Sequence, residues 1–175
     1  MAKLFVLEGV ERCGKTSLMR MLKENNHEIV INTEEKFPQY LPEEQKKPYT
    51  LGFIDGYLNI FNSNNKTYFL DRFFLSEFCF SEFKKRNTYV NADYIKKIVK
   101  NNRVVTFYLH NTYSDYLLRG PKNKMLTEAH YAELQFIFEK NIKWLETDYN
   151  LGFIRIDSNQ KTLQEIYQII TNYIK

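Results

Sequence analysis

The fold of this chain follows from one stretch near its N-terminus, Leu4-Phe5-Val6-Leu7-Glu8-Gly9-Val10-Glu11-Arg12-Cys13-Gly14-Lys15-Thr16-Ser17. Residues 9–16 of this stretch match the pattern G-x-x-x-x-G-K-[ST]. The pattern lies between an apolar run typical of a strand and an amphipathic stretch typical of a helix. The glycines allow the backbone to curl so that several N–H groups point at one spot, and the helix start adds its positive dipole end. The stretch therefore predicts a strand, a phosphate-binding loop and a helix, and with them a site for a nucleoside triphosphate.

The chemistry of the loop residues indicates which of them would contact the triphosphate. Lys15 would reach the β- and γ-phosphates as a flexible point charge, and the Thr16 hydroxyl would bind Mg²⁺. We expect ATP and Mg²⁺ as cofactors, with Mg²⁺ arriving on the nucleotide rather than held in a cage of protein ligands. The residues expected to bind the triphosphate are Gly9, Cys13, Gly14, Lys15, Thr16 and Ser17.

The composition predicts one globular domain over residues 1–175. Hydrophobic residues are 43% of the chain and charged residues 26%, which allows a substantial core. The net charge of +4 suits an anionic substrate, but the charge is spread evenly, so we expect no nucleic-acid partner. The apolar runs all fall short of the roughly 18 residues that span a bilayer, so we expect no membrane partner.

The two cysteines, Cys13 and Cys79, do not suggest a disulfide framework, and the N-terminus lacks a signal-peptide pattern. Alanine is scarce, whereas lysine, asparagine, isoleucine and tyrosine are abundant, a bias typical of AT-rich genomes. We therefore expect a cytoplasmic location, in a low-GC bacterium or in the host cell if the chain is viral.

Apolar runs and amphipathic stretches alternate along the chain. The expected strands are Lys3–Glu8, His27–Asn32, Thr67–Asp71, Arg103–Leu109 and Phe153–Asp157. The expected helices are Lys15–Lys23, Tyr49–Phe61, Leu75–Lys85, Ala92–Lys100, Ser114–Arg119, Thr127–Asp148 and Thr162 to the end. This alternation predicts an α/β chain with the three-layer P-loop NTPase fold, a mostly parallel sheet of about five strands with helices on both faces. Functional residues should lie where the strands end, because ligands bind there in such folds.

A second group of polar residues follows the expected strand at Thr67–Asp71. A carboxylate such as Asp71, at the end of a strand beside the phosphate loop, is what organises Mg²⁺ in this class of site. Arg72 would enter the same cleft and could hold an anionic oxygen in fork geometry. The alternative use of this pair is a loop salt bridge.

On these residues the chain resembles the thymidylate kinase family, within the P-loop nucleoside monophosphate and deoxynucleoside kinases. The phosphate loop of that family is similar to Glu8–Thr16 of this chain. The family has an acidic residue at the position of Glu11, and the branch that includes the eukaryotic enzymes also has arginine at the position of Arg12. The family's Asp-Arg-Tyr segment is similar to Asp71-Arg72-Phe73, and Ser76 matches the small polar position after it. Weaker matches are Lys36-Phe37-Pro38, Leu118-Arg119-Gly120 and Asp157-Ser158.

The resemblance implies transfer of the γ-phosphoryl group of ATP to a (deoxy)nucleoside monophosphate, with dTMP or a relative as first candidate. It implies that Glu11 faces the acceptor sugar, that Arg12 reaches the transferred group as an arginine finger, and that Arg72 binds the acceptor phosphate. Lys15, Arg12, Asp71 and Arg72 would thus be catalytic, and Thr16 and Asp71 would hold the metal.

The remaining roles come from the same resemblance. Phe53 would stack on the acceptor base, with Tyr57, Lys36 and Phe37 also on the acceptor side. Arg119 would cover the adenine of ATP, and Asn159 is assigned to the same nucleotide. A short lid is expected over about residues 119–126, where Lys122 and Lys124 could close over the phosphates. The aromatic residues Phe73, Phe74, Phe78, Phe80 and Phe83 could form a homodimer face or belong to the core.

Three alternatives to this function stay open. The first follows from a departure from the family: the chain has no arginine between Arg20 and Arg72, so Tyr57 stands where an arginine usually follows the stacking Phe. A deoxynucleoside kinase would instead need a general base near the 5′-hydroxyl, which Glu34 or Glu35 could provide. The others are a non-catalytic ATP-binding regulatory module and a kinase acting on nucleic-acid ends, for which the sequence shows no basic groove pattern.

Overall fold

The structure is a computed structural model that describes residues 2–25, 29–32, 42–119, 126–159 and 161–174. In these ranges the strands are β1 (Lys3–Gly9), β2 (Ile29–Asn32), β3 (Thr67–Asp71), β4 (Arg103–His110) and β5 (Phe153–Asp157). The helices are α1 (Lys15–Glu24), α2 (Glu43–Asn62), α3 (Phe74–Phe83), α4 (Ala92–Asn101), α5 (Tyr113–Leu118), α6 (Glu128–Tyr149) and α7 (Leu163–Asn172).

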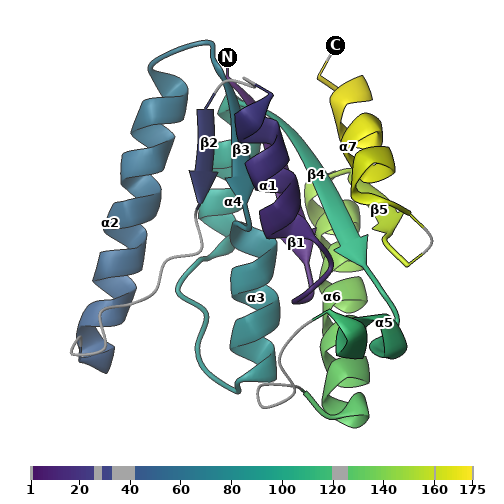
Figure 1. Ribbon diagram of the computed structural model, residues 1–175. Coiled ribbons are helices and arrows are strands. Elements are labelled where there is room, and N and C mark those ends of the chain that lie inside the picture. The colour runs from purple at the N-terminus through teal and green to yellow at the C-terminus, as the bar shows by residue number, and fades with distance from the viewer. Residues whose placement is uncertain (1, 26–28, 33–41, 120–125, 160, 175) are drawn as a thin grey trace.

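The described strands form one sheet in the order β2-β3-β1-β4-β5, and each neighbouring pair is parallel (Figure 1). The central strand β1 lies between β3 and β4, with Leu7 opposite Asp71 on one side and Gly9 opposite Leu109 on the other. The carboxyl ends of these strands therefore meet at one edge of the sheet, where the phosphate loop begins. The predicted α/β fold with a parallel five-stranded sheet is confirmed.

Helices cover both faces of the sheet, with α1 and α7 on one face and α3, α4 and α6 on the other (Figure 1). The alternation of side chains along a strand explains the two layers. Phe5 stacks on Phe107, which contacts Tyr173 just after α7, whereas the next residue, Tyr108, stacks on Phe138 of α6. Both faces of the central strands are thus buried, as their nearly continuous apolar sequence predicts.

The helix α2 begins at Glu43, six residues before the expected start, and contains Pro48. Proline lacks an N–H and usually ends or breaks a helix, and for that reason the sequence predicts a helix that starts after Pro48. The structure shows that this prediction was wrong. The five residues before it are Glu, Gln and Lys, which have high helix propensity and extend the helix through the proline. The C-terminal helix α7 also stops at Asn172 rather than running to the end, while the other described boundaries lie within two residues of expectation.

Across the described ranges, none of the helices combines the length and the apolarity that crossing a bilayer would require.

Gly9 ends β1 in a conformation that other residues rarely adopt, with φ at +134°. A Cβ atom there would lie 2.0 Å from the carbonyl oxygen of Leu109. We therefore expect Gly9→Ala to lower the free energy of unfolding by about 2–4 kcal/mol, through backbone strain and the clash together. Urea denaturation measures this, with Gly152→Ala as control because a Cβ there meets nothing within 4 Å. Equal stability of the two variants would contradict the prediction.

Candidate functional site

The phosphate loop between β1 and α1 turns through three residues with positive φ, namely Gly9 (134°), Arg12 (62°) and Gly14 (92°). Gly14 is the N-cap of α1, so no side chain there accepts a hydrogen bond from the first-turn N–H groups, and that turn contains no acidic residue. The positive end of the helix dipole is thus left to an external anion, as the loop sequence predicts.

Lys15 is the first residue of α1, and its side chain folds back into the loop. Its Nζ donates to the carbonyl oxygens of Gly9 at 3.0 Å and Val10 at 2.5 Å, and lies 3.3 Å from the sulfur of Cys13. The residue is only 5% exposed, and burial lowers the pKa of its ammonium group. Charged phosphate oxygens would be stronger acceptors than the neutral carbonyls that hold Lys15 here.

Asp71 ends β3 directly beside the end of β1, opposite Leu7 in the parallel register. Asp71 is 3% exposed. Burial of Lys15 lowers the pKa of its ammonium group, and the negative charge of Asp71 acts in the opposite direction by raising that pKa. The predicted neighbourhood of the Asp-Arg segment and the phosphate loop is therefore present in the structure.

Arg72 follows in a left-handed conformation with φ at 67°, which turns the chain sharply after β3. Its backbone N–H donates to Leu7 O at 2.9 Å, which extends the β1–β3 pairing by one bond. Its guanidinium donates to Gly9 O at 3.1 Å and to Ser76 Oγ at 3.3 Å, and lies 5.0 Å from the centre of the Phe80 ring. The arginine is thereby held against the phosphate loop.

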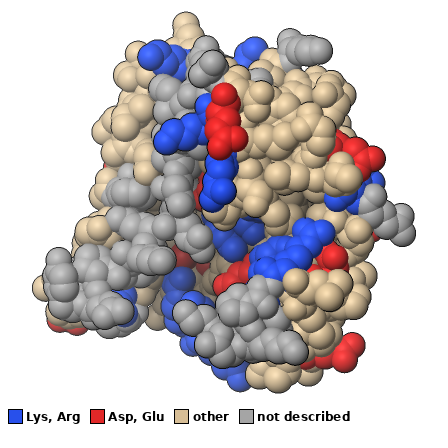
Figure 2. Space-filling model, viewed as in Figure 1, with Lys and Arg blue, Asp and Glu red and all other residues tan. Residues whose placement is uncertain are grey.

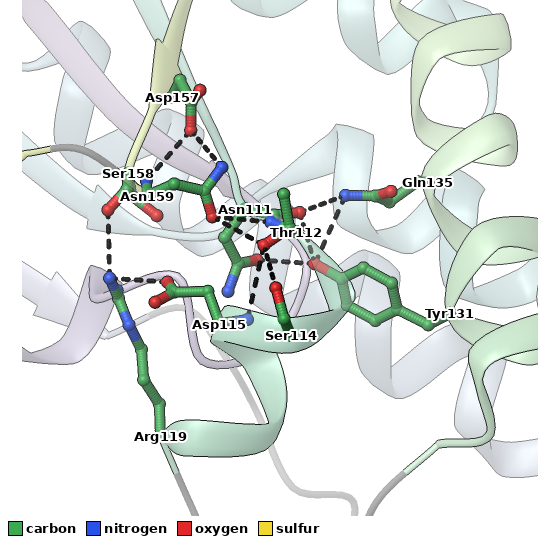
Figure 3. Close-up of polar contacts among 10 residues, drawn as sticks. All are labelled: Asn111, Thr112, Ser114, Asp115, Arg119, Tyr131, Gln135, Asp157, Ser158 and Asn159. Atoms are coloured by element: carbon green, nitrogen blue, oxygen red, sulfur yellow. Dashed lines mark hydrogen bonds and ion pairs between the residues drawn. The ribbon is translucent and has the colours of Figure 1, made fainter.

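Two further arginines lie at α5, Arg12 from the phosphate loop and Arg119 from the end of the helix itself. Arg12 lies over the ring of Tyr116, 4.6 Å from its centre, and donates to Tyr116 O at 3.4 Å. Arg119 pairs with Asp115 at 2.7 Å and donates to Ser158 O at 3.0 Å, which ties the end of α5 to the segment after β5 (Figure 3).

These elements enclose a cavity of about 610 Å³, a volume within the range of small-molecule sites. It is lined by Glu11, Arg12, Cys13, Gly14, Lys15, Thr16, Ser17, Asp71, Arg72, Arg119, Lys161, Leu163 and Ile166. The described lining thus carries five cationic side chains against two carboxylates. Figure 2 shows Lys and Arg side chains gathered around the hollow on this face. Such a site suits a polyanion.

Most of the expected loop and strand-end residues therefore meet in one cavity, but three expected residues that the structure describes are not among those that line it. One of them is Gly9, at the end of β1. Asn159 donates to Asp157 Oδ1 at 2.5 Å and accepts from the Thr112 N–H at 2.7 Å, so it joins the ends of β4 and β5 (Figure 3). Tyr57 stacks on Phe61 within α2, with ring centres 5.9 Å apart. The binding roles expected of these three residues stay predictions.

Several expectations fall on parts that the structure does not describe. These are Lys36 and Phe37, the alternative bases Glu34 and Glu35, lid residues 120–125, and the side chain of Phe53.

Three of the five aromatic residues considered for a homodimer face, Phe78, Phe80 and Phe83, contact α6 of the same chain. Phe78 meets Trp144 edge to face with ring centres 5.3 Å apart, and Phe80 meets Phe138 at 5.9 Å. Contacts within the chain therefore account for these three rings, and the homodimer stays a prediction.

Sequence reasoning missed part of the cavity and its support. Leu163 and Ile166 line the side formed by the start of α7 and have no sequence signal, whereas Lys161 lies in the segment 157–161 after β5, where the rule about strand ends predicts functional residues. Tyr116, the platform under Arg12, has no sequence signal. Glu8 precedes the first glycine of the phosphate loop, and the sequence indicates no role for it, although it is completely buried beside Arg72.

Thr16 and Asp71 both line the cavity, and their hydroxyl and carboxylate oxygens are donors that Mg²⁺ accepts alongside phosphates and water. Within the described ranges, no group of three or more His, Cys, Asp or Glu side chains is placed to hold a metal ion alone. The residues present therefore fit a metal ion that is bound mainly through the nucleotide.

No protein-family model matches this chain, and no curated protein sequence matches it. Solved structures do share its fold. The YorR protein of Bacillus subtilis, in complex with phosphorylated GDP, is 18% identical with a TM-score of 0.71, covering 98% of this chain and 95% of that one. The thymidylate kinase of Candida albicans is 11% identical (TM-score 0.68, 99% and 91% covered), and the deoxyadenosine kinase of M. mycoides with bound dATP is 16% identical (TM-score 0.62, 98% of both). At these identities the likeness establishes a shared fold and nothing beyond the fold.

Proposed function

We propose that this chain transfers the γ-phosphoryl group of ATP to a nucleotide or nucleoside. A deoxynucleoside monophosphate, dTMP or a relative, is the first candidate acceptor. The observation that supports this most strongly is the position of Arg72, held against Gly9 O at the end of β3 and lining the same cavity as Lys15 and Arg12. One cavity thus offers cations to the triphosphate and a further cation to a second phosphate.

Phosphoryl transfer depends mainly on positioning and on stabilising charge spread over the transferred oxygens. Lys15 would bind the β- and γ-phosphates, and Arg12 would reach the transferred group from its platform on Tyr116. Arg119 would bind the nucleoside end of ATP, together with the apolar Leu163 and Ile166, which line the same cavity. Mg²⁺, held by Thr16 and Asp71, would supply further positive charge to the phosphates. The proposal includes one kinase domain over residues 1–175 with a lid over about 119–126.

A deoxynucleoside is the second candidate acceptor. The observation that favours it lies in α2, the helix expected over the acceptor, because its residues Glu43–Asn62 contain no arginine. A monophosphate kinase of the resembled family would usually have one there.

An acceptor screen distinguishes these proposals. ADP release would be measured with ATP and Mg²⁺ against each common nucleoside and nucleoside monophosphate. We expect turnover above ATP hydrolysis with at least one deoxynucleoside monophosphate. Turnover with nucleosides alone would support the second candidate. Failure with every acceptor would contradict both and leave an ATP-binding module.

Replacing Arg72 tests the acceptor site. We expect Arg72→Ala to raise the KM for the monophosphate by about 10- to 100-fold, because a charge-assisted hydrogen bond to a phosphate is lost. The KM for ATP should change by no more than about twofold. Arg86→Ala is the matched control, since Arg86 pairs with Glu77 at 2.8 Å and does not line the cavity. Unchanged acceptor kinetics in Arg72→Ala would remove this assignment.

A further inference from the structure

Glu8, near the end of β1, is a carboxylate with no exposed surface. Its Oε1 accepts from the backbone N–H of Phe73 at 2.9 Å, and its Oε2 accepts from the hydroxyl of Ser76. Burial raises the pKa of this carboxyl, whereas the Ser76 hydrogen bond and the charge of Arg72 act in the opposite direction. Burying a carboxylate costs free energy, so a role outside general stability would explain its presence.

The contacts of Glu8 converge on Arg72 by two routes. The guanidinium of Arg72 donates to Ser76 Oγ at 3.3 Å, and Ser76 donates to Glu8, so a hydroxyl links the two charges. Glu8 also holds the N–H of Phe73, the residue after the left-handed turn at Arg72. A non-glycine residue in that conformation is strained and needs support from its surroundings. Glu8 supports both the backbone turn and the side chain of Arg72.

We propose that Glu8 is a positioning residue that sets the geometry of Arg72 for the acceptor phosphate. This inference rests on the proposed function. Glu8 itself does not line the cavity, so it would act through Ser76 and the Phe73 peptide rather than by touching a ligand. An arginine fixed in this way gives up little side-chain entropy when it binds a phosphate.

The chain contains a similar arrangement away from the cavity, which provides a matched control. Glu77 in α3 accepts from Arg86 at 2.8 and 2.9 Å, from Ser81 at 3.0 Å and from the Tyr89 N–H at 3.1 Å. It too combines an arginine, a serine and a backbone N–H, but none of these residues lines the cavity.

The test compares Glu8→Gln with Glu77→Gln. Glutamine at position 8 retains an oxygen for the Phe73 N–H and removes the charge. We expect Glu8→Gln to raise the acceptor KM by about tenfold, with kcat and the KM for ATP within about twofold. Glu77→Gln should leave the acceptor KM within about twofold. Ser76→Ala, which interrupts the hydroxyl link and keeps Glu8, should also raise the acceptor KM and serves if Glu8→Gln does not fold.

A double-mutant cycle tests whether Glu8 acts through Arg72. In an Arg72→Ala background, Glu8→Gln should change the acceptor KM by no more than about twofold. A full tenfold effect in that background, or none in the wild-type background, would overturn the proposal.

A spectroscopic readout separates this inference from the proposed function. The ¹⁵N–¹H signal of Arg72 Nε, assigned by its loss in Arg72→Ala, should shift or broaden in Glu8→Gln and stay in place in Glu77→Gln. An unchanged signal in Glu8→Gln would overturn the positioning role whether or not the protein turns over. A wild-type protein without turnover would contradict the proposed function alone.

Discussion

Replacing Lys15 by methionine should lower kcat for phosphoryl transfer by about a thousandfold and also weaken ATP binding. Methionine keeps the length and the buried packing of the side chain but removes the charge. Lys15 is 5% exposed and held by Gly9 O and Val10 O, within the loop whose N–H groups would surround the phosphates. On the proposed function the ammonium group would stabilise both the bound nucleotide and the charge that develops during transfer, so kcat and the KM for ATP should change together.

The measurements are initial rates of ADP release and the thermal shift produced by ATP. Lys23→Met is the control, because Lys23 is exposed in the last turn of the same helix. Lys15→Arg should not restore activity, since a planar fork cannot take the place of a compact ammonium among these carbonyls. Full activity of Lys15→Met with any acceptor would rule out the phosphate-binding role.

Arg12→Ala is the second change with a large expected effect. We expect kcat to fall by about a thousandfold while the KM for ATP changes little, because an arginine finger acts mainly on the transition state. The structure holds Arg12 over Tyr116 at 4.6 Å, with a hydrogen bond to Tyr116 O at 3.4 Å. Arg12→Lys keeps the charge but loses the fork geometry, so it should restore only part of the rate.

Steady-state kinetics with ATP and acceptor varied separately distinguish the outcomes. Arg20→Ala is the matched control, because Arg20 is an exposed arginine on α1. A rise in the KM for ATP at unchanged kcat would make Arg12 a nucleotide-binding residue instead. Unchanged values of both would show that Arg12 takes no part in the reaction.

The agreement between sequence and structure was best where the signal is local. The boundaries of β3 and β5 match the expectation, because each is a short apolar run between polar turns. The predicted start of α2 was wrong because the prediction gave more weight to Pro48 than to the helix propensity of the residues before it. In the structure the helix continues through the proline. Of the loop residues that the motif indicates, 13–17 line the cavity, and the strand-end rule correctly placed Asp71 and Arg72 beside them.

The sequence by itself determined the order of strands and helices, the phosphate loop and the edge of the sheet at which a ligand would bind. These depend on periodicity and on spacing within a few residues, which are properties of short segments. Only the tertiary structure decided that Arg12 rests on Tyr116, 104 residues away, and that Glu8 meets Ser76, 68 residues away. Such contacts arise when packing of the core brings distant segments together, and no local pattern along the chain records which partner each side chain will meet.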